Sequence, residues 1–318
     1  PRWTEGEGWR VDLKPLLDLS TTRSRPEHEF HGVADAPRLE DGSIVVANGG
    51  SEEVLFFTSD GVLESAVGGE GDGPGEFRGL RSVDRYRDDS VAVFDSQARR
   101  VTILDAEHGV GRTTTFGMGS TDEVHVLSNG DFLLRESSLK TTVPVRRSAR
   151  IPRLLVRTTP TGNVLGTLVV SASYDLDLDR ASGTPPYWKR SLLTVSADGV
   201  VVGDADDAEF RVYSLDGSLR RVVRVVENLP DGSGRLTDPI SDQPPKLEER
   251  EPAWKAAYSD LVVDSEGYFW LSAYHPAGLS TVPRGWLVFS PDGTWLGTVA
   301  LPPNFDAVEV GPDYVLGR

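Results

Sequence analysis

Cysteine is absent from the 318 residues of this chain. Disulfide bonds, thiolate zinc sites and cysteine nucleophiles are therefore excluded. The Gly-x-Ser-x-Gly motif is also missing, which excludes the serine mechanism of α/β-hydrolases. No segment approaches the roughly 18 consecutive apolar residues of a membrane-spanning helix.

Basic charge is scarce as well. The chain has 33 Lys and Arg against 49 Asp and Glu, and its formal net charge is −16. No run of basic residues is longer than two, so the sequence lacks the electrostatic footprint of a nucleic-acid-binding protein. An anionic membrane surface would repel such a chain. We therefore expect neither nucleic acid nor membrane as a partner.

Short apolar segments rich in Val and Leu recur along the whole chain. Examples are Ser43–Asn48, Val91–Phe94 and Tyr268–Leu271. Each is bounded by Gly, Asp, Asn or Ser, which is typical of strands that end in tight turns. Helical periodicity is almost absent, and residues 246–258 are the best candidate for a helix.

Two series of turns alternate between these segments. The first series precedes a strand six times: Asp41-Gly42, Asp88-Asp89, Asn129-Gly130, Asp198-Gly199, Glu266-Gly267 and Gly311-Pro312. The second series follows the next strand five times: Asp60-Gly61, His108-Gly109, Thr161-Gly162, Asp216-Gly217 and Asp292-Gly293. Asp-Gly and Asn-Gly supply the positive φ angles of tight hairpins. The repeated unit of four antiparallel strands predicts an all-β fold, a six-bladed β-propeller.

The predicted propeller is a single domain that spans residues 1–318. We expect an N-terminal strand to close the ring within a last blade that is short of strands, where a partner could donate one. The predicted ranges are 1–20 for the closing strand, 21–68 for blade one, 69–116 for blade two, 117–170 for blade three, 171–226 for blade four, 227–301 for blade five with a long insertion, and 302–318 for the start of blade six.

One blade carries a more specific motif. The run Gly69–Phe77, followed by Val91–Asp95 and Arg100–Leu104, resembles the NHL-repeat propellers. It is most similar to their exported bacterial branch, most members of which have no assigned activity. The resemblance implies the fold and an extracytoplasmic location: periplasmic, secreted, or lipid-anchored through a removed leader. The glycines of this run would shape the crossing between two blades, and Phe77 would fill the space between their sheets.

Four long insertions fall on one predicted face of the propeller: 136–153, 171–190, 228–254 and 275–284. Long loops on one rim of a rigid scaffold are a usual place for a binding site. Residues near this rim or near the starts of the innermost strands are the predicted ligand-binding residues: His31, Arg78, His125, Lys189, Tyr258 and His275. Arg78 and Lys189 could orient an anionic ligand.

Three candidate metal sites are alternatives to a rim without metal. Three converging histidines, His31, His125 and His275, could hold zinc with one open position. The carboxylates Asp175, Asp177 and Asp179 resemble the opening of a calcium loop but lack its glycine and its closing Glu. Glu29, Asn48 and Asp204 could also be placed in the roles of calcium ligands at a channel mouth.

Two functions follow from these patterns. The first is a non-enzymatic binding or interaction scaffold that takes a protein, peptide or small-molecule ligand on the long-loop face and needs no cofactor. The alternative is a metal-dependent hydrolase or lyase at the channel mouth, with zinc or calcium. No complete catalytic motif favours the second function, so the first is our prediction.

Overall fold

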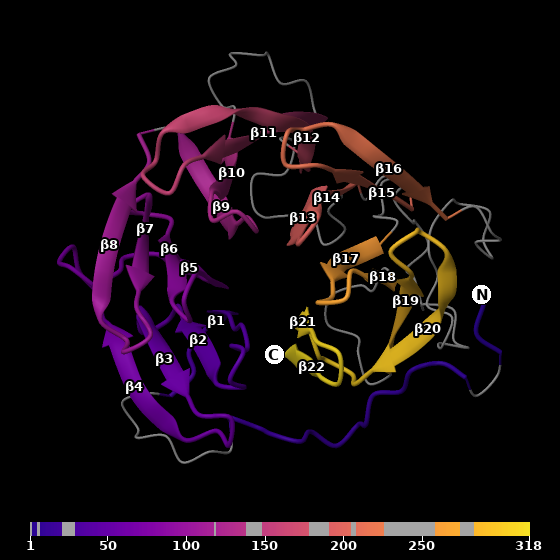
Figure 1. The fold of residues 1–318 in the computed structure, drawn as a ribbon, viewed down its shortest axis with the longest axis horizontal. Helices are drawn as coiled ribbons and strands as arrows, with labels where there is room; N and C mark the ends of the chain where they lie inside the picture. The colour runs from indigo at the N-terminus through magenta and orange to yellow at the C-terminus, as the bar shows by residue number, and fades with distance from the viewer. Residues whose placement is uncertain are drawn as a thin grey trace.

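The protein is built from strands arranged in a ring. The computed structural model describes residues 2–4, 7–20, 29–117, 119–137, 148–177, 191–204, 208–225, 258–273 and 283–318. Their strands form five four-stranded sheets and one two-stranded sheet, placed around a central opening (Figure 1). The prediction of an all-β, six-bladed propeller is confirmed.

Each sheet is an antiparallel meander of strands that follow one another in the chain. In Figure 1 the first strand of each sheet lies nearest the centre and the fourth strand lies at the perimeter. The strands are β1 (Val33–Asp35), β2 (Ile44–Asn48), β3 (Glu53–Phe57), β4 (Leu63–Gly68), β5 (Leu80–Arg85), β6 (Val91–Asp95), β7 (Arg100–Leu104), β8 (Val110–Thr115), β9 (Ser120–Val126), β10 (Phe132–Ser137), β11 (Ser148–Thr158), β12 (Val164–Asp177), β13 (Ser191–Ser196), β14 (Gly199–Asp204), β15 (Glu209–Tyr213), β16 (Leu219–Arg224), β17 (Tyr258–Val263), β18 (Phe269–Ala273), β19 (Arg284–Phe289), β20 (Trp295–Leu301), β21 (Ala307–Val310) and β22 (Val315–Gly317).

The turns that separate these strands adopt the backbone conformation expected from their residues. Gly42 and Gly61 have φ angles of +91° and +80°, which glycine adopts without the steric penalty of a Cβ atom. The turn at Asp88 and Asp89 has φ angles of +54° and +55°, and Asp tolerates this left-handed region better than most residues. The two turn series therefore mark the hairpins of the propeller.

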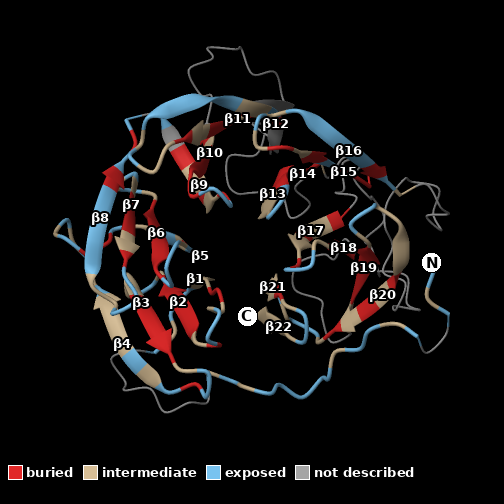
Figure 2. Cartoon of the chain, in the orientation of Figure 1, coloured by how far each residue is buried: buried red, intermediate tan, exposed pale blue. Residues whose placement is uncertain are grey.

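The hydrophobic core is divided among the junctions between neighbouring sheets. There are six clusters of buried side chains, and each joins one sheet to the next around the ring. Phe77 is fully buried between the first and second blades, where it packs as predicted, and burial of a Phe side chain contributes about 1.5–3 kcal/mol. Burial is concentrated in the middle of each sheet, while the outer strands are half-buried, as in β4 and β20, or exposed, as in β8 and β16 (Figure 2).

The closing element differs from the prediction. Residues 2–4 and 7–20 contain no strand, so the sixth sheet has only β21 and β22 rather than three strands. Asp12 and Asp18 accept hydrogen bonds from backbone N–H groups two residues further along, and such local bonds compete with a strand ladder. The segment instead crosses the open side of the sixth sheet (Figure 1). There Val11 joins the core next to the fifth blade, and Leu17 and Leu19 join the core of the first.

The third blade is longer than predicted. β11 and β12 pair from Thr158↔Val164 to Ser148↔Asp177, so the sheet continues past the predicted boundary at residue 170. Parts of two predicted rim loops are therefore strands. The predicted helix at 246–258 lies outside the described residues apart from Tyr258, which begins β17. Within the described residues, no helix is long and apolar enough to cross a membrane.

Candidate functional site

The predicted ligand-binding residues are distributed over several blades. Lys189 and His275 lie outside the described residues. The other four are His31 before β1, Arg78 before β5, His125 on β9 and Tyr258 at the start of β17. Among the described contacts, no hydrogen bond or ion pair joins any two of these four. The described contacts do not bring these four residues together, and their role in ligand binding stays a prediction.

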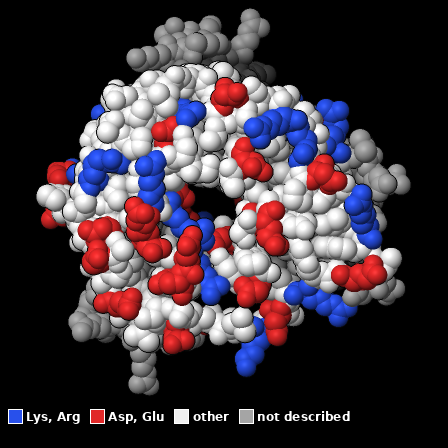
Figure 3. Space-filling view, in the orientation of Figure 1, with Lys and Arg blue, Asp and Glu red and all other residues white. Residues whose placement is uncertain are grey.

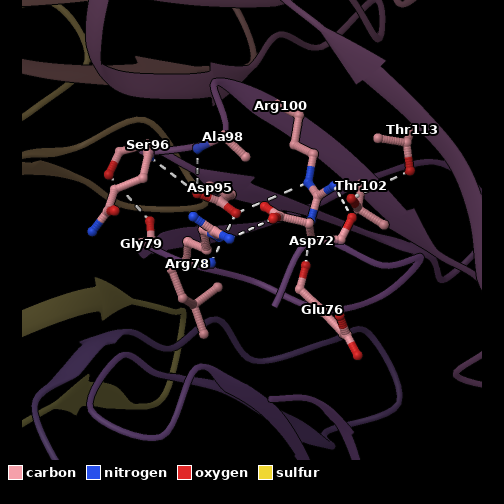
Figure 4. Close-up of polar contacts among 12 residues, drawn as sticks. Asp72, Glu76, Arg78, Gly79, Asp95, Ser96, Ala98, Arg100, Thr102 and Thr113 are labelled. Atoms are coloured by element: carbon pink, nitrogen blue, oxygen red, sulfur yellow. Dashed lines mark hydrogen bonds and ion pairs between the residues drawn. The ribbon is translucent and has the colours of Figure 1, made fainter. Parts of the chain in front are cut away.

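Arg78 belongs to a polar network that holds the glycine-rich loop (Figure 4). Its backbone N–H donates a hydrogen bond of 3.0 Å to Oδ2 of Asp95, and its guanidinium forms an ion pair with Asp72. Arg100 donates to the carbonyl oxygens of Asp72 and Glu76. These contacts support the structural role predicted for the loop. They also give the positive charge of Arg78 an acidic partner before any ligand arrives.

Asn48 is occupied by similar structural contacts. Its Oδ1 accepts a hydrogen bond of 2.7 Å from the backbone N–H of His31. Its Nδ2 donates to the carbonyl oxygen of Glu29 and to Oγ of Ser51. The side chain is fully buried, so Asn48 fastens the entry to the first blade. Across the residues that the structure describes, no group of three or more His, Asp or Glu side chains is arranged to hold a metal ion.

His125 lies on the innermost strand of the third blade, in an acidic environment. Its Nε2 is 2.8 Å from Oε1 of Glu123. Burial alone lowers the pKa of His125, but the hydrogen bond to Glu123 and the negative charges of Glu123, Asp84 and Asp35 outweigh burial and raise it. His125 therefore favours the protonated form, paired with a carboxylate.

The two aspartates near His125 connect neighbouring blades. Oδ2 of Asp35 in the first blade accepts a hydrogen bond of 3.2 Å from the backbone N–H of Val83 in the second. Oδ2 of Asp84 in the second blade accepts an equivalent bond from Val126 in the third. Burial raises the pKa of both carboxyl groups, and in Asp35 burial together with the negative charge of Asp84 raises the pKa to about 7. The space-filling view shows charged side chains of both signs at the margin of the central opening (Figure 3).

A small cavity lies between the third and fourth blades. It has a volume of about 50 Å³, which is room for a few water-sized groups. Its walls come from β12 and from the strands β13, β14 and β15. The polar lining residues are Ser171, Ser191, Asp204, Glu209, Arg211 and Tyr213.

Glu209 is the electrostatic centre of this cavity. Its side chain is 8% exposed and accepts hydrogen bonds of 2.8 Å from Nε of Arg211 and from Nε of Arg224. Burial raises the pKa of Glu209, but the hydrogen bonds and charges of Arg224 and Arg211 outweigh this and lower it. Glu209 is therefore an ionised carboxylate held in place by two cations.

One predicted residue, Tyr258, does not line this cavity but holds the backbone of Glu209, which does. Its hydroxyl donates a hydrogen bond of 2.9 Å to the carbonyl oxygen of Glu209. Burial raises the pKa of Tyr258, and the charges of Asp204 and Glu209 add to this, so the phenol stays protonated and keeps its donor. Within the described part of the chain, Oγ of Ser171 is buried and has no hydrogen-bond partner.

Sequence reasoning identified part of this arrangement. Asp204 was named from the sequence, as a possible calcium ligand. The contact between Glu209 and Arg224 could not be derived from the sequence, because the two residues are fifteen positions apart. They meet because they are paired opposite each other on β15 and β16. Ser171 was placed in a predicted loop, whereas it is part of β12.

Comparisons with known proteins identify the fold. No protein-family model matches the sequence, and no curated protein is significantly similar to it. A member of the DUF4221 family from Bacteroides vulgatus superposes with a TM-score of 0.57 at 10% identity, covering 90% of this chain and 86% of that one. A Bacteroides fragilis protein described as exported gives 0.52 at 12% identity, with coverage of 88% and 73%.

A weaker likeness is to virginiamycin B lyase from Staphylococcus aureus. The TM-score is 0.45 at 10% identity, with coverage of 89% of this chain and 75% of that one. At these identities structural similarity concerns the fold and not the activity. The resemblance to exported bacterial propellers predicted from the sequence is thus confirmed at the level of structure.

Proposed function

We propose that the protein is a non-enzymatic binding scaffold that takes a peptide or protein partner on the long-loop face. The observation that carries this proposal is the cavity between the third and fourth blades, where a buried carboxylate is fixed by two arginines. The cavity lies beside the middle of β12, the start of β13, the end of β14 and the length of β15. One of the long insertions predicted for the ligand-binding face, 171–190, ends directly before β13.

The size of the cavity favours a peptide over a whole metabolite. A volume of about 50 Å³ admits one small group, whereas pockets for drug-sized ligands occupy roughly 300–1,000 Å³. A side chain or chain terminus that projects from a larger partner fits this restriction.

The polar lining offers both donors and acceptors to such a group. Arg211 remains about half exposed while it binds Glu209, and Ser171 adds a buried hydroxyl whose hydrogen-bonding capacity is unused. A ligand that hydrogen-bonds to Ser171 would remove the cost of leaving that group unsatisfied, about 1–3 kcal/mol. We also propose an extracytoplasmic location, in line with the structural similarity to a protein described as exported.

A peptide array tests the proposal. An array of random twelve-residue peptides is probed with the protein, and the dissociation constants of captured peptides are measured with wild type and variants. We expect Arg211→Glu to weaken binding by about tenfold or more, because it places a like charge beside Glu209. Ser171→Ala removes the hydroxyl with little change in side-chain volume and should weaken binding. Arg112→Glu on β8 serves as the control and should change the affinity less than about twofold.

Two outcomes would contradict the proposal. One is capture of no peptide, or of peptides whose affinity is the same for Arg211→Glu and wild type. The other is a stoichiometric metal in the purified protein that is lost in His125→Ala, measured by elemental analysis. The second outcome would favour the metal-dependent hydrolase or lyase.

A further inference from the structure

The outer strand of the third blade differs from the other outer strands. β12 has 14 residues, whereas β4, β8, β16 and β20 have six or seven. From Val164 to Tyr174 the strand contains no charged residue. Charged residues interrupt three of the other outer strands: Glu64 in β4, Arg112 in β8, and Arg220, Arg221 and Arg224 in β16. Charges on an edge strand discourage pairing with another chain.

The other uncharged outer strand, β20, is covered by the protein itself. The backbone N–H groups of Arg2 and Trp3 donate hydrogen bonds to the carbonyl oxygens of Trp295 and Leu296. β12, by contrast, pairs with β11 on one side. Among the described residues, no backbone hydrogen bond reaches its other edge. Within the described part of the chain, the uncharged stretch of β12 from Val164 to Tyr174 is thus left open, where the equivalent edge of β20 is protected.

Apolar side chains accompany this open edge. Val164, Leu165 and Val170 are 53%, 54% and 61% exposed. The next blade continues the apolar surface, since Leu219 and Val222 of β16 are also exposed. Figure 2 shows exposed residues on both β12 and β16.

The two strands are close in space as well. A Cβ atom on Gly217, in the turn before β16, would lie 2.7 Å from the carbonyl oxygen of Leu168 in β12. The surface that continues from β12 is positively charged. β16 carries Arg220, Arg221 and Arg224, all exposed, in a protein with a net charge of −16. Arg224 is already paired with Glu209, so Arg220 and Arg221 supply most of the positive charge offered to a partner. An acidic group placed over β16 would meet these arginines, whereas most of the molecule would repel it.

We propose that β12 binds an extended segment of a partner protein by strand addition, with apolar residues of that segment along Val164–Val170 and acidic residues over the arginines of β16. Main-chain hydrogen bonds to an open edge supply affinity in this mode, and side chains supply specificity. The proposal rests on the proposed binding function and names its partner class.

Charge distinguishes this partner from a second copy of the chain. In an antiparallel pair of two β12 strands, the two-fold axis leaves both β16 strands on the same side of the interface. The arginines of one copy would then approach those of the other. A neutral segment with an acidic end avoids this repulsion.

The test uses two labelled peptides, Val-Thr-Val-Thr-Val-Thr-Asp-Asp and the same peptide ending in Lys-Lys. Fluorescence anisotropy with the full chain should show that the acidic peptide binds about tenfold more tightly, with an affinity that falls as salt rises from about 50 to 500 mM. Leu165→Lys should weaken the acidic peptide by about tenfold, because it places a charge on the edge. Val110→Lys, at an exposed valine of β8, is the matched control and should change the affinity less than about twofold.

Three results would overturn the proposal. The first is equal binding, or no binding, of the two peptides. The second is an equal loss of affinity in Leu165→Lys and Val110→Lys. The third is sedimentation of the protein alone as a dimer that Leu165→Lys dissociates, which would identify a second copy as the occupant. If array peptides still depend on Arg211 while the Asp-Asp peptide does not bind, the strand-addition proposal fails and the binding scaffold stands.

Discussion

Oε2 of Glu309 accepts a hydrogen bond of 3.0 Å from the backbone N–H of Arg38. Glu309 lies on β21 in the sixth sheet, and Arg38 follows β1 in the first blade, so this contact joins the two ends of the ring. Oε1 of Glu309 accepts hydrogen bonds from the guanidinium of Arg85 and from the hydroxyl of Tyr314. The guanidinium of Arg38 lies over the Tyr314 ring, 4.5 Å from its centroid. A single carboxylate therefore connects the sixth sheet to the first two blades.

Glu309→Ala should lower the free energy of unfolding by about 2–3 kcal/mol, because it removes hydrogen bonds that involve a charged group and leaves a backbone donor without its acceptor. Urea denaturation measures the change. Glu64→Ala, at an exposed carboxylate on β4, is the control and should shift stability by less than about 0.5 kcal/mol. Equal midpoints for the two variants would mean that Glu309 does not hold the ring closed.

The N-terminal segment should also contribute to closure. The ring of Trp9 stacks on that of Trp270 with centroids 5.6 Å apart, and it meets the rings of Tyr268 and Trp3 at 5.0 and 5.2 Å. Because Trp9 is 40% exposed, Trp9→Ala should cost about 1–2 kcal/mol of stability rather than the 3–5 kcal/mol of a fully buried tryptophan. Leu16→Ala, in the same segment but almost fully exposed, should have no measurable effect. A matching loss in both variants would contradict the anchoring role of Trp9.

The fold could be predicted because its signals are local. Each hairpin is encoded by a short turn such as Asp41-Gly42, in which the glycine takes the positive φ angle that the turn requires. Phe77 follows a glycine-rich run, so its place between two blades could also be derived from a short stretch of sequence. Repetition of these signals gives the number of blades.

The closing element and the cavity depend on pairings that short stretches do not reveal. The N-terminal segment was expected to be a strand, but Asp12 and Asp18 bond to nearby backbone N–H groups instead of supporting a ladder. Glu209 meets Arg224 only because β15 pairs with β16 in one register. The candidate site therefore follows from the order of the strands in the sheet as much as from the residues themselves.

Tyr258→Phe should destabilise the protein by about 1–2 kcal/mol, because the variant leaves the buried carbonyl oxygen of Glu209 without the donor that it has now. Tyr86→Phe is the matched control: its hydroxyl accepts a longer hydrogen bond, 3.2 Å, from an exposed Arg112. That variant should change stability by less than about 0.5 kcal/mol. Chemical denaturation of both variants tests this, and an unchanged midpoint for Tyr258→Phe would contradict the supporting role.

The half-buried carboxyl of Asp35 predicts a dependence of stability on pH. Burial raises its pKa from 3.8 to about 7 in the folded protein, so between these values the folded state binds the proton more tightly than the unfolded state. This contribution to stability is fully present below about pH 4 and is lost as pH rises through 7.

Asp35→Asn cannot ionise, so the fall in the free energy of unfolding between pH 5 and 8 should be smaller in the variant, by on the order of 2 kcal/mol. Urea titrations at pH 5, 6, 7 and 8 measure the difference, with the exposed Glu64→Gln as the control that should retain the wild-type profile. Superimposable profiles for Asp35→Asn and wild type would show that Asp35 does not carry this proton at neutral pH.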